Sequence, residues 1–214
     1  MKRTVHDESE WIFPFIEYSP VQATGRKLPL IVRLHGAGER GNGGDELIAV
    51  DRPYIADMMS ENEFECILVL PQCPHNSFWA ARIESILAFI EQIKAHYDID
   101  EERISMTGVS MGGYGTWFTA MARPDIFSAI APICGGGMAW NAEVLDMPIW
   151  TFHGTEDATV SCNQTEEMVE ALIKYGADVK YTRLEGYGHG IGDVAHTKEL
   201  WEWLISKRRP KSEE

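Results

Sequence analysis

Residues 104–115 read Ile-Ser-Met-Thr-Gly-Val-Ser-Met-Gly-Gly-Tyr-Gly, and this stretch decides the fold class of the chain. Its first half is an apolar run typical of a strand, and its second half continues into a segment typical of a helix. Between the two lies Gly108-Val109-Ser110-Met111-Gly112, a G-x-S-x-G sequence. A serine in this setting occupies a sharp, strained strand-to-helix turn, and the flanking glycines keep side chains from blocking it. Ser110 is therefore the candidate nucleophile.

Strand-like and helix-like segments alternate along the whole chain. Several strand-like segments are apolar throughout, which is typical of parallel strands buried on both faces. The alternation predicts an α/β fold, a three-layer α/β/α sandwich with a mostly parallel sheet. Pro14 indicates an edge position for the first strand. Strands are predicted at 11–18, 28–34, 64–70, 103–109, 129–134, 149–152 and 179–184, and helices at 83–93, 117–121, 168–172 and 200–204.

Length and composition indicate one domain, residues 1–214, in which the charged tail 207–214 is predicted to fray. The net charge of −14 argues against nucleic acid or an anionic membrane as a partner. The chain has no run of 18 apolar residues and no signal-peptide core, and its four cysteines are widely spaced. We therefore expect a cytoplasmic protein that acts on a small molecule, with its oligomeric state left open.

Two further residues complete a candidate catalytic triad. A serine hydroxyl needs a base to take its proton, and the base needs a carboxylate to orient it. Where the serine lies on a strand–turn–helix, the chain order is serine, acid, histidine. Asp157 follows the strand predicted at 149–152, and His189 lies in a glycine-rich loop after the strand at 179–184. Because the carboxyl ends of parallel strands meet at one sheet edge, Asp157 is the predicted acid and His189 the predicted base.

Other acids and histidines of the chain are assigned different roles. Glu156 and Asp193 are rival acids, and Asp193 is predicted to cap the final helix. His35 and His153 each precede a glycine at a strand end, and we expect them to bond the backbone around the site loops. His196 is predicted to lie on a solvated helix surface.

An oxyanion hole is also required, because the tetrahedral intermediate of acyl transfer carries a negative charge. One donor is expected to be the backbone N–H of Met111, the residue after the nucleophile. The second is expected from the loop 35–41, from either Ala37 or Gly38, of which Ala37 is favoured.

Substrate-contacting residues are predicted near the site loops. The candidates are Trp79, Gly38, Tyr114 and Trp140, of which Trp79 is favoured among the aromatic residues, although core packing is an alternative for all three aromatics. Only 13 residues separate Cys134 from Pro148, where a lid would insert, so a minimal lid and an open cleft are expected. The longer segment 38–62 is predicted to form one wall.

Four phrases of the chain carry a resemblance to a known superfamily. They are LPLIVRLHGAGERG at 28–41, PQCP at 71–74, GVSMGG at 108–113 and HGTED at 153–157. Over residues 28–205 the chain resembles an α/β-hydrolase of the branch of small carboxylesterases, feruloyl and acetyl esterases, dienelactone-hydrolase-like proteins and "predicted peptidases".

The resemblance implies the triad Ser110, Asp157 and His189 and no cofactor or metal. Dienelactone hydrolases proper use a cysteine nucleophile, whereas position 110 is serine, which argues against dienelactone chemistry proper. The N-terminal part is short, so the first strands of the full fold are expected to be missing and the size of the sheet is left open.

Three functional hypotheses follow. The first is a serine carboxylesterase that cleaves esters of small or medium acyl groups through an acyl-enzyme. The second is a peptidase or amidase with the same triad, which would need an anchor for a peptide terminus; Arg33, Arg40 and Arg82 are candidates. The third is a non-catalytic, hydrolase-like binding protein, in which Ser110 is only a turn residue.

Overall fold

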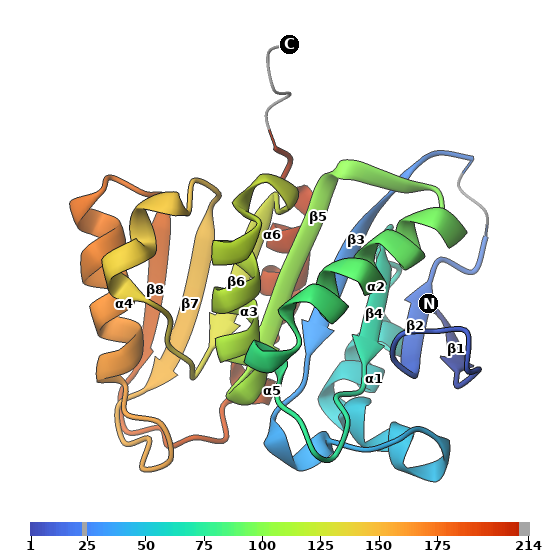
Figure 1. The fold of residues 1–214 in the computed structure, drawn as a ribbon, viewed down its shortest axis with the longest axis horizontal. Helices are drawn as coiled ribbons and strands as arrows, with labels where there is room; N and C mark the ends of the chain where they lie inside the picture. The colour runs from blue at the N-terminus through green and yellow to red at the C-terminus, as the bar shows by residue number, and fades with distance from the viewer. Residues whose placement is uncertain (23–24, 210–214) are drawn as a thin grey trace.

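The computed structural model describes residues 1–22 and 25–209, and its centre is an eight-stranded sheet (Figure 1). The strand order is β1-β2-β4-β3-β5-β6-β7-β8. The pairs β1–β2 and β2–β4 are antiparallel, and every other pair is parallel. The strands are β1 Lys2–His6, β2 Phe15–Ser19, β3 Leu28–Leu34, β4 Ile67–Pro71, β5 Ile99–Val109, β6 Ala129–Ile133, β7 Ile149–Gly154 and β8 Val179–Leu184.

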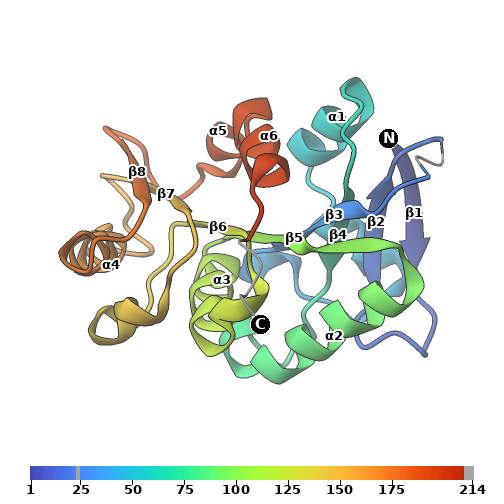
Figure 2. The ribbon, with the colours of Figure 1, turned by 90° about the horizontal axis from the view of Figure 1, so that it is seen from above.

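Helices cover both faces of this sheet, which confirms the predicted three-layer α/β/α sandwich. Seen from above, α2, α3 and α4 lie on one side of the sheet and α1, α5 and α6 on the other (Figure 2). The carboxyl ends of the parallel strands lie along the lower edge in Figure 1, so their loops meet there. The helices are α1 Pro53–Glu61, α2 Ile83–His96, α3 Met111–Ala122, α4 Asn163–Lys174, α5 Gly192–Ala195 and α6 Lys198–Ser206.

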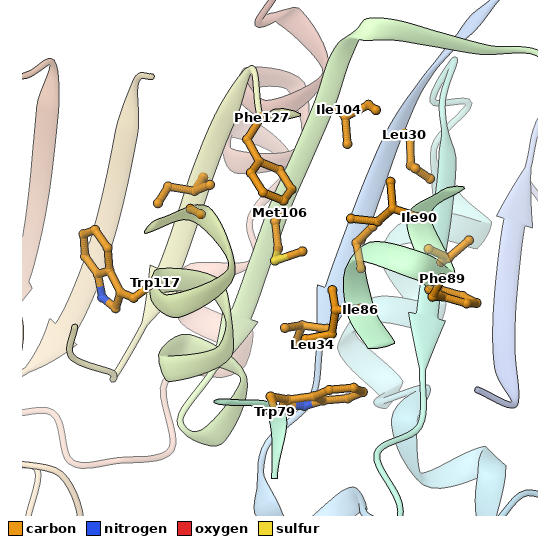
Figure 3. Close-up of a cluster of buried hydrophobic side chains, with 14 of the residues drawn as sticks. Leu30, Leu34, Trp79, Ile86, Phe89, Ile90, Ile104, Met106, Trp117 and Phe127 are labelled. Atoms are coloured by element: carbon orange, nitrogen blue, oxygen red, sulfur yellow. The ribbon is translucent and has the colours of Figure 1, made fainter. Parts of the chain in front are cut away.

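Two apolar clusters, one on each face, hold the layers together. The first packs α2 and α3 against β3 and β5 through side chains such as Leu30, Met106 and Phe89 (Figure 3). The second packs α1 and α6 on the opposite face. Burying one such large apolar side chain contributes about 1.5–3 kcal/mol, so these clusters fix the sheet that carries the loops. No helix among the described residues is long and apolar enough to cross a membrane.

The N-terminal strands differ from expectation. β2 is not an edge strand, because β1 pairs with it in full register from Lys2 to His6. Pro14 precedes β2 instead of interrupting it, and its carbonyl accepts from the N–H of Gln72. β1 escaped prediction because its residues are charged or polar at four of five positions, as suits an exposed edge. The sheet is therefore not shortened at its N-terminal end.

Two assignments near the C-terminus were wrong. His196 is 1% exposed and therefore not solvated. It follows the short helix α5, which packs it against the sheet, and its ring stacks on Trp201. The final helix α6 is capped by Thr197, whose side chain accepts from the N–H of Leu200, whereas Asp193 lies within α5. Of the tail predicted to fray, Arg209 bonds the carbonyls of Pro124 and Phe127, and residues 210–214 lie outside the described part.

The burial of His196 predicts a loss of stability in acid. Burial, with the charge of Arg33, lowers its pKa to about 3, whereas in the unfolded chain the pKa is near 6.5. The unfolded state therefore binds a proton that the folded state does not, so stability is complete above about pH 6.5 and falls toward pH 3, by about 1.4 kcal/mol per pH unit from this residue. We expect the free energy of unfolding of His196→Gln, measured with urea, to fall less steeply between pH 6 and pH 4.5 than that of the wild type. An unchanged slope would contradict the lowered pKa of the buried His196.

Candidate active site

Ser110 lies at the turn between β5 and α3, as predicted. Its φ is 58° and its ψ is −116°, a conformation that non-glycine residues rarely adopt. The turn is held from both sides: the N–H of Ser110 donates to the Ile133 carbonyl at 2.8 Å, and its carbonyl accepts from the N–H of Tyr114 at 3.0 Å. The surrounding backbone thus holds the strained serine in place at the carboxyl edge of the sheet.

The glycines of the motif allow the backbone around Ser110 to pack closely. A Cβ on Gly112 would lie 2.1 Å from the Leu34 carbonyl oxygen, and one on Gly108 would lie 2.4 Å from the Gly112 carbonyl oxygen. Both contacts are with backbone, which cannot move aside as a flexible side chain can. The strand-to-helix turn at Ser110 therefore requires glycine at these two positions.

Gly112→Ala is expected to lower the free energy of unfolding by about 3 kcal/mol or more, because the added methyl group overlaps the end of β3. Urea unfolding measures the change. Gly38→Ala is the matched control, since a Cβ there has no heavy atom within 4 Å. Equal stabilities of the two variants would contradict the close packing of Gly112 against the Leu34 carbonyl.

The three predicted triad residues meet at this edge. The Nε2 atom of His189 lies 2.8 Å from Ser110 Oγ, and its Nδ1 atom lies 2.6 Å from Asp157 Oδ2. Ser110 comes from the end of β5, Asp157 from the loop after β7 and His189 from the loop after β8. In the neutral ring, Nδ1–H donates to the carboxylate and Nε2 accepts the serine proton, which is the arrangement that a general base requires.

Asp157 is fixed by four donors. Its Oδ1 accepts from the N–H groups of Thr159 and Val160, both at 2.8 Å. Burial raises the pKa of this carboxyl, but the bonds from Val160, His189 and Thr159 outweigh that effect and place the pKa below its usual value. Asp157 is therefore ionised at neutral pH and can stabilise a positive charge on His189.

His153 is a partner of the acid that the sequence analysis did not assign. It is fully buried, and its Nε2 lies 3.2 Å from Asp157 Oδ2 and 3.0 Å from the Val160 carbonyl oxygen. Its Nδ1 lies 2.8 Å from the Thr165 hydroxyl. Both neighbours of Nε2 accept, so that nitrogen carries a hydrogen and donates to the acid. The spacing of four residues between His153 and Asp157 was the available signal.

The predicted oxyanion loop lies beside Ser110. His35 is buried, accepts from the N–H of Cys73 through Nε2 at 2.9 Å, and so holds the loop against the end of β4. Burial lowers its pKa to about 3, so the ring is neutral. Ala37 begins the short helix η1 Ala37–Glu39, and Met111 begins α3. The first N–H groups of a helix have no partner within it, so both remain available as donors.

A pocket of about 530 Å³ opens at Ser110 and His189. Its wall includes Gly38, Arg52 and Tyr54, as expected for the segment 38–62. Of the three arginines considered as anchors, Arg33 lines the pocket. The other two hold neighbouring loops: Arg40 donates to the carbonyls of Ala37 and Ser77, and Arg82 donates to the Ser77 hydroxyl.

The aromatic candidates do not line this pocket. Trp79 is fully buried in the first apolar cluster, and its indole N–H donates to the His35 carbonyl (Figure 3). It therefore supports the predicted oxyanion loop, and it has no exposed surface with which to contact a substrate. Tyr114 donates its hydroxyl to Gln164, and Trp140 is 76% exposed in the short helix η5 Ala139–Val144.

One group of side chains at the acid has metal-ligand chemistry. The donor atoms of Cys134, His153 and Asp157 lie within 4.8 Å of one another. Burial, and then the negative charge of Asp157, raises the pKa of the Cys134 thiol to about 12, which opposes the thiolate that a metal needs. Asp157 Oδ2 is already bonded by two histidines. Cys134 and His153 are better explained as packed neighbours of Asp157, the predicted acid.

The proteins to which the chain is similar include two curated proteins and a solved esterase structure. Poly(3-hydroxyalkanoate) depolymerase C of Paucimonas lemoignei is 40% identical over 156 residues, and the bifunctional acetylxylan esterase/xylanase XynS20E of Neocallimastix patriciarum is 34% identical over 148 residues. These matches cover 55% and 54% of this chain but only 37% and 22% of those proteins. A thermostable esterase is 33% identical with a TM-score of 0.79, over 97% of this chain and 63% of that one.

The family follows from a direct sequence match over most of the chain. Residues 57–197 match the dienelactone hydrolase family, and this range includes Ser110, Asp157 and His189. The observed sheet and layers are those that the similar esterase structure shares. The chain belongs to the dienelactone hydrolase family and has the α/β-hydrolase fold.

Proposed function

We propose that the protein is a serine esterase that hydrolyses carboxylic esters of small or medium acyl groups. The observation that carries this proposal is the continuous hydrogen-bonded chain from Ser110 Oγ through His189 to Asp157, at 2.8 and 2.6 Å. The similarity to an esterase structure and to an acetylxylan esterase supports esters as the substrate class. A fold alone does not determine the substrate, so the assignment depends on the site.

The reaction proceeds in two steps. His189 Nε2 takes the hydroxyl proton of Ser110 while Oγ attacks the ester carbonyl carbon, and the resulting imidazolium gives that proton to the leaving alcohol. This leaves an ester between Ser110 and the acyl group. His189 then takes a proton from water, whose oxygen attacks the acyl carbon, and returns it to Ser110 as the acid leaves. Asp157 remains ionised throughout.

The negative charge on the former carbonyl oxygen is held by backbone N–H groups. We assign these to Met111, after the nucleophile, and to Ala37, in the loop that His35 and Trp79 hold in place. Removing one such donor costs about 3–4 kcal/mol of transition-state stabilisation in enzymes of this type.

The open site favours small substrates. The segment between β6 and β7 forms only the short helix η5, so no lid over the pocket comes from it. The pocket volume of about 530 Å³ suits a small molecule. All four cysteines are unpaired, which supports the cytoplasmic location as a prediction.

Matched ester and amide substrates test this function. We expect turnover of p-nitrophenyl acetate and butyrate, and little turnover of the corresponding p-nitroanilides, with kcat/KM measured for each pair. Preferential hydrolysis of the anilides would favour the peptidase alternative. No turnover of either class by folded protein, together with no labelling by a fluorophosphonate, would favour the binding-protein alternative.

A further inference from the structure

His153 is a fully buried histidine near the end of β7, and both nitrogens of its ring have close partners. Nε2 lies 3.2 Å from Asp157 Oδ2 and 3.0 Å from the Val160 carbonyl oxygen. Nδ1 lies 2.8 Å from the hydroxyl oxygen of Thr165 in α4. That hydroxyl in turn donates to the Gly135 carbonyl at 2.6 Å. These four contacts determine how many hydrogens the ring carries.

Neither neutral form of the ring satisfies these contacts. With its one hydrogen on Nδ1, the lone pair of Nε2 would face the oxygens of Asp157 and Val160, which only accept. With the hydrogen on Nε2, the lone pair of Nδ1 would face the Thr165 oxygen, whose single hydrogen is already given to Gly135. Turning that hydroxyl toward Nδ1 would leave two acceptor oxygens 2.6 Å apart. Only an imidazolium, with a hydrogen on each nitrogen, gives every contact a donor and an acceptor.

Asp157 supplies the negative charge that a buried imidazolium needs. A buried charge is unfavourable unless it is paired and its hydrogen-bonding groups are satisfied. The pKa of the Asp157 carboxyl lies below its usual value, because its hydrogen bonds outweigh the effect of burial, so the carboxylate is ionised. Both ring hydrogens of His153 also have acceptors. The charged ring therefore meets both conditions where it lies.

The other titratable groups on this face of the sheet leave that ion pair intact. Burial is the main cause that raises the pKa of the Cys134 thiol and of the Tyr181 hydroxyl, each to about 12, so both are uncharged. Arg183 lies beside the buried ring in the register of β7 and β8. Its guanidinium pairs with Glu166 and Glu185 at the exposed surface, where water screens all three charges.

The two histidines share one oxygen of the acid. Asp157 Oδ2 lies 2.6 Å from Nδ1 of His189 and 3.2 Å from Nε2 of His153. A nearby carboxylate favours the protonated form of a histidine, and a nearby cation opposes it. A charged His153 therefore cancels part of the effect of the acid on His189. The base then releases its proton more readily and remains able to accept from Ser110 at lower pH.

We propose that His153 is a buried imidazolium that acts as a positioning residue of the triad, holding Asp157 ionised and oriented and extending the action of His189 as a base toward acid pH. This inference rests on the proposed esterase function. His153 is fully buried, so it touches no substrate and acts through Asp157.

The pH profile of kcat/KM for p-nitrophenyl acetate tests the effect on the base. The acid limb of this profile reports the protonation of the base in the free enzyme. His153→Gln keeps a polar side chain and removes the positive charge. We therefore expect the acid limb to move to higher pH by about one unit. An acid limb that does not move in folded His153→Gln would overturn the proposal.

Variants of Thr165 separate the charge from a loss of packing. Thr165→Val removes the acceptor of the Nδ1 hydrogen, so we expect it to move the acid limb in the same direction, whereas Thr165→Ser keeps the hydroxyl and the wild-type limb. Thr151→Val is the matched control, since Thr151 is also buried in β7 and its hydroxyl donates to the Pro132 carbonyl at 2.8 Å. Circular dichroism checks folding, and Thr165→Val serves alone if His153→Gln does not fold. Equal limbs in Thr165→Val and Thr151→Val would overturn the proposal.

Nitrogen-15 NMR of the histidine rings counts the hydrogens directly and needs no turnover. At about pH 7.5 we expect two protonated ring nitrogens for His153, whose signals are identified by their change in Thr165→Val. His35 and His196 are internal controls, because burial lowers the pKa of each to about 3 and leaves one protonated nitrogen. One protonated nitrogen on His153 would overturn the proposal and leave the esterase function standing. Two protonated nitrogens in a folded protein that hydrolyses no ester would retain the imidazolium and reject the esterase function.

Discussion

Ser110→Ala is expected to lower kcat for p-nitrophenyl acetate on the order of 10⁶-fold, since removing a triad serine costs about as much as removing the whole triad. The physical reason is that Oγ is the atom that attacks, and its contact with His189 Nε2 at 2.8 Å is where the proton leaves. Without it, only the oxyanion donors and the binding energy remain. Initial rates of the purified variant measure the change.

Ser60→Ala is the matched control for that substitution. Ser60 lies in α1 and donates to the Asp57 carbonyl, away from the pocket, so its variant is expected to retain full activity. A Ser110→Ala variant that keeps more than about a hundredth of the wild-type rate would be inconsistent with covalent catalysis, because a triad deletion leaves far less.

Asp157→Asn is expected to lower kcat about 10⁴-fold with little change in fold. The two backbone N–H groups that now bond Oδ1 can bond the amide oxygen, so the loop keeps its shape. The amide nitrogen then faces His189 Nδ1 and donates to it, which places the ring hydrogen on Nε2, the nitrogen that must accept from Ser110. The tautomer is therefore wrong for catalysis.

Glu156→Gln distinguishes the assigned acid from its neighbour in sequence. Glu156 is exposed, so neutralising it is expected to change kcat by less than about twofold, as for most surface substitutions. A large loss in Glu156→Gln with a small one in Asp157→Asn would reverse the assignment. Rates for both variants come from the same ester assay, after circular dichroism has confirmed that each is folded.

The central strands and the triad could be predicted because their signals are local. The strand at 28–34 has its predicted bounds. A near-continuous apolar run that starts after a loop and ends before His-Gly is typical of a strand buried on both faces of a parallel sheet. Ser110, Asp157 and His189 each follow a parallel strand of the sheet, so their meeting at one edge follows from topology alone.

Other features depend on packing that no local pattern records. His196 resembles a surface residue in sequence, but α5 brings it beneath the sheet. Trp79 follows a site loop, yet it points into the core because α3 has glycine where the two meet: a Cβ on Gly115 would lie 2.5 Å from the Trp79 Cβ. His153 bonds Asp157 only because the loop after β7 folds back over four residues.

The most direct test of the account is labelling of the wild-type protein with a fluorophosphonate, followed by peptide mass spectrometry. The account predicts a single phosphonylated residue, Ser110, loss of ester hydrolysis in proportion to labelling, and no label in Ser110→Ala. Labelling that persists on another residue in Ser110→Ala, or a folded wild type that takes up no label, would contradict the claim that Ser110 is the nucleophile.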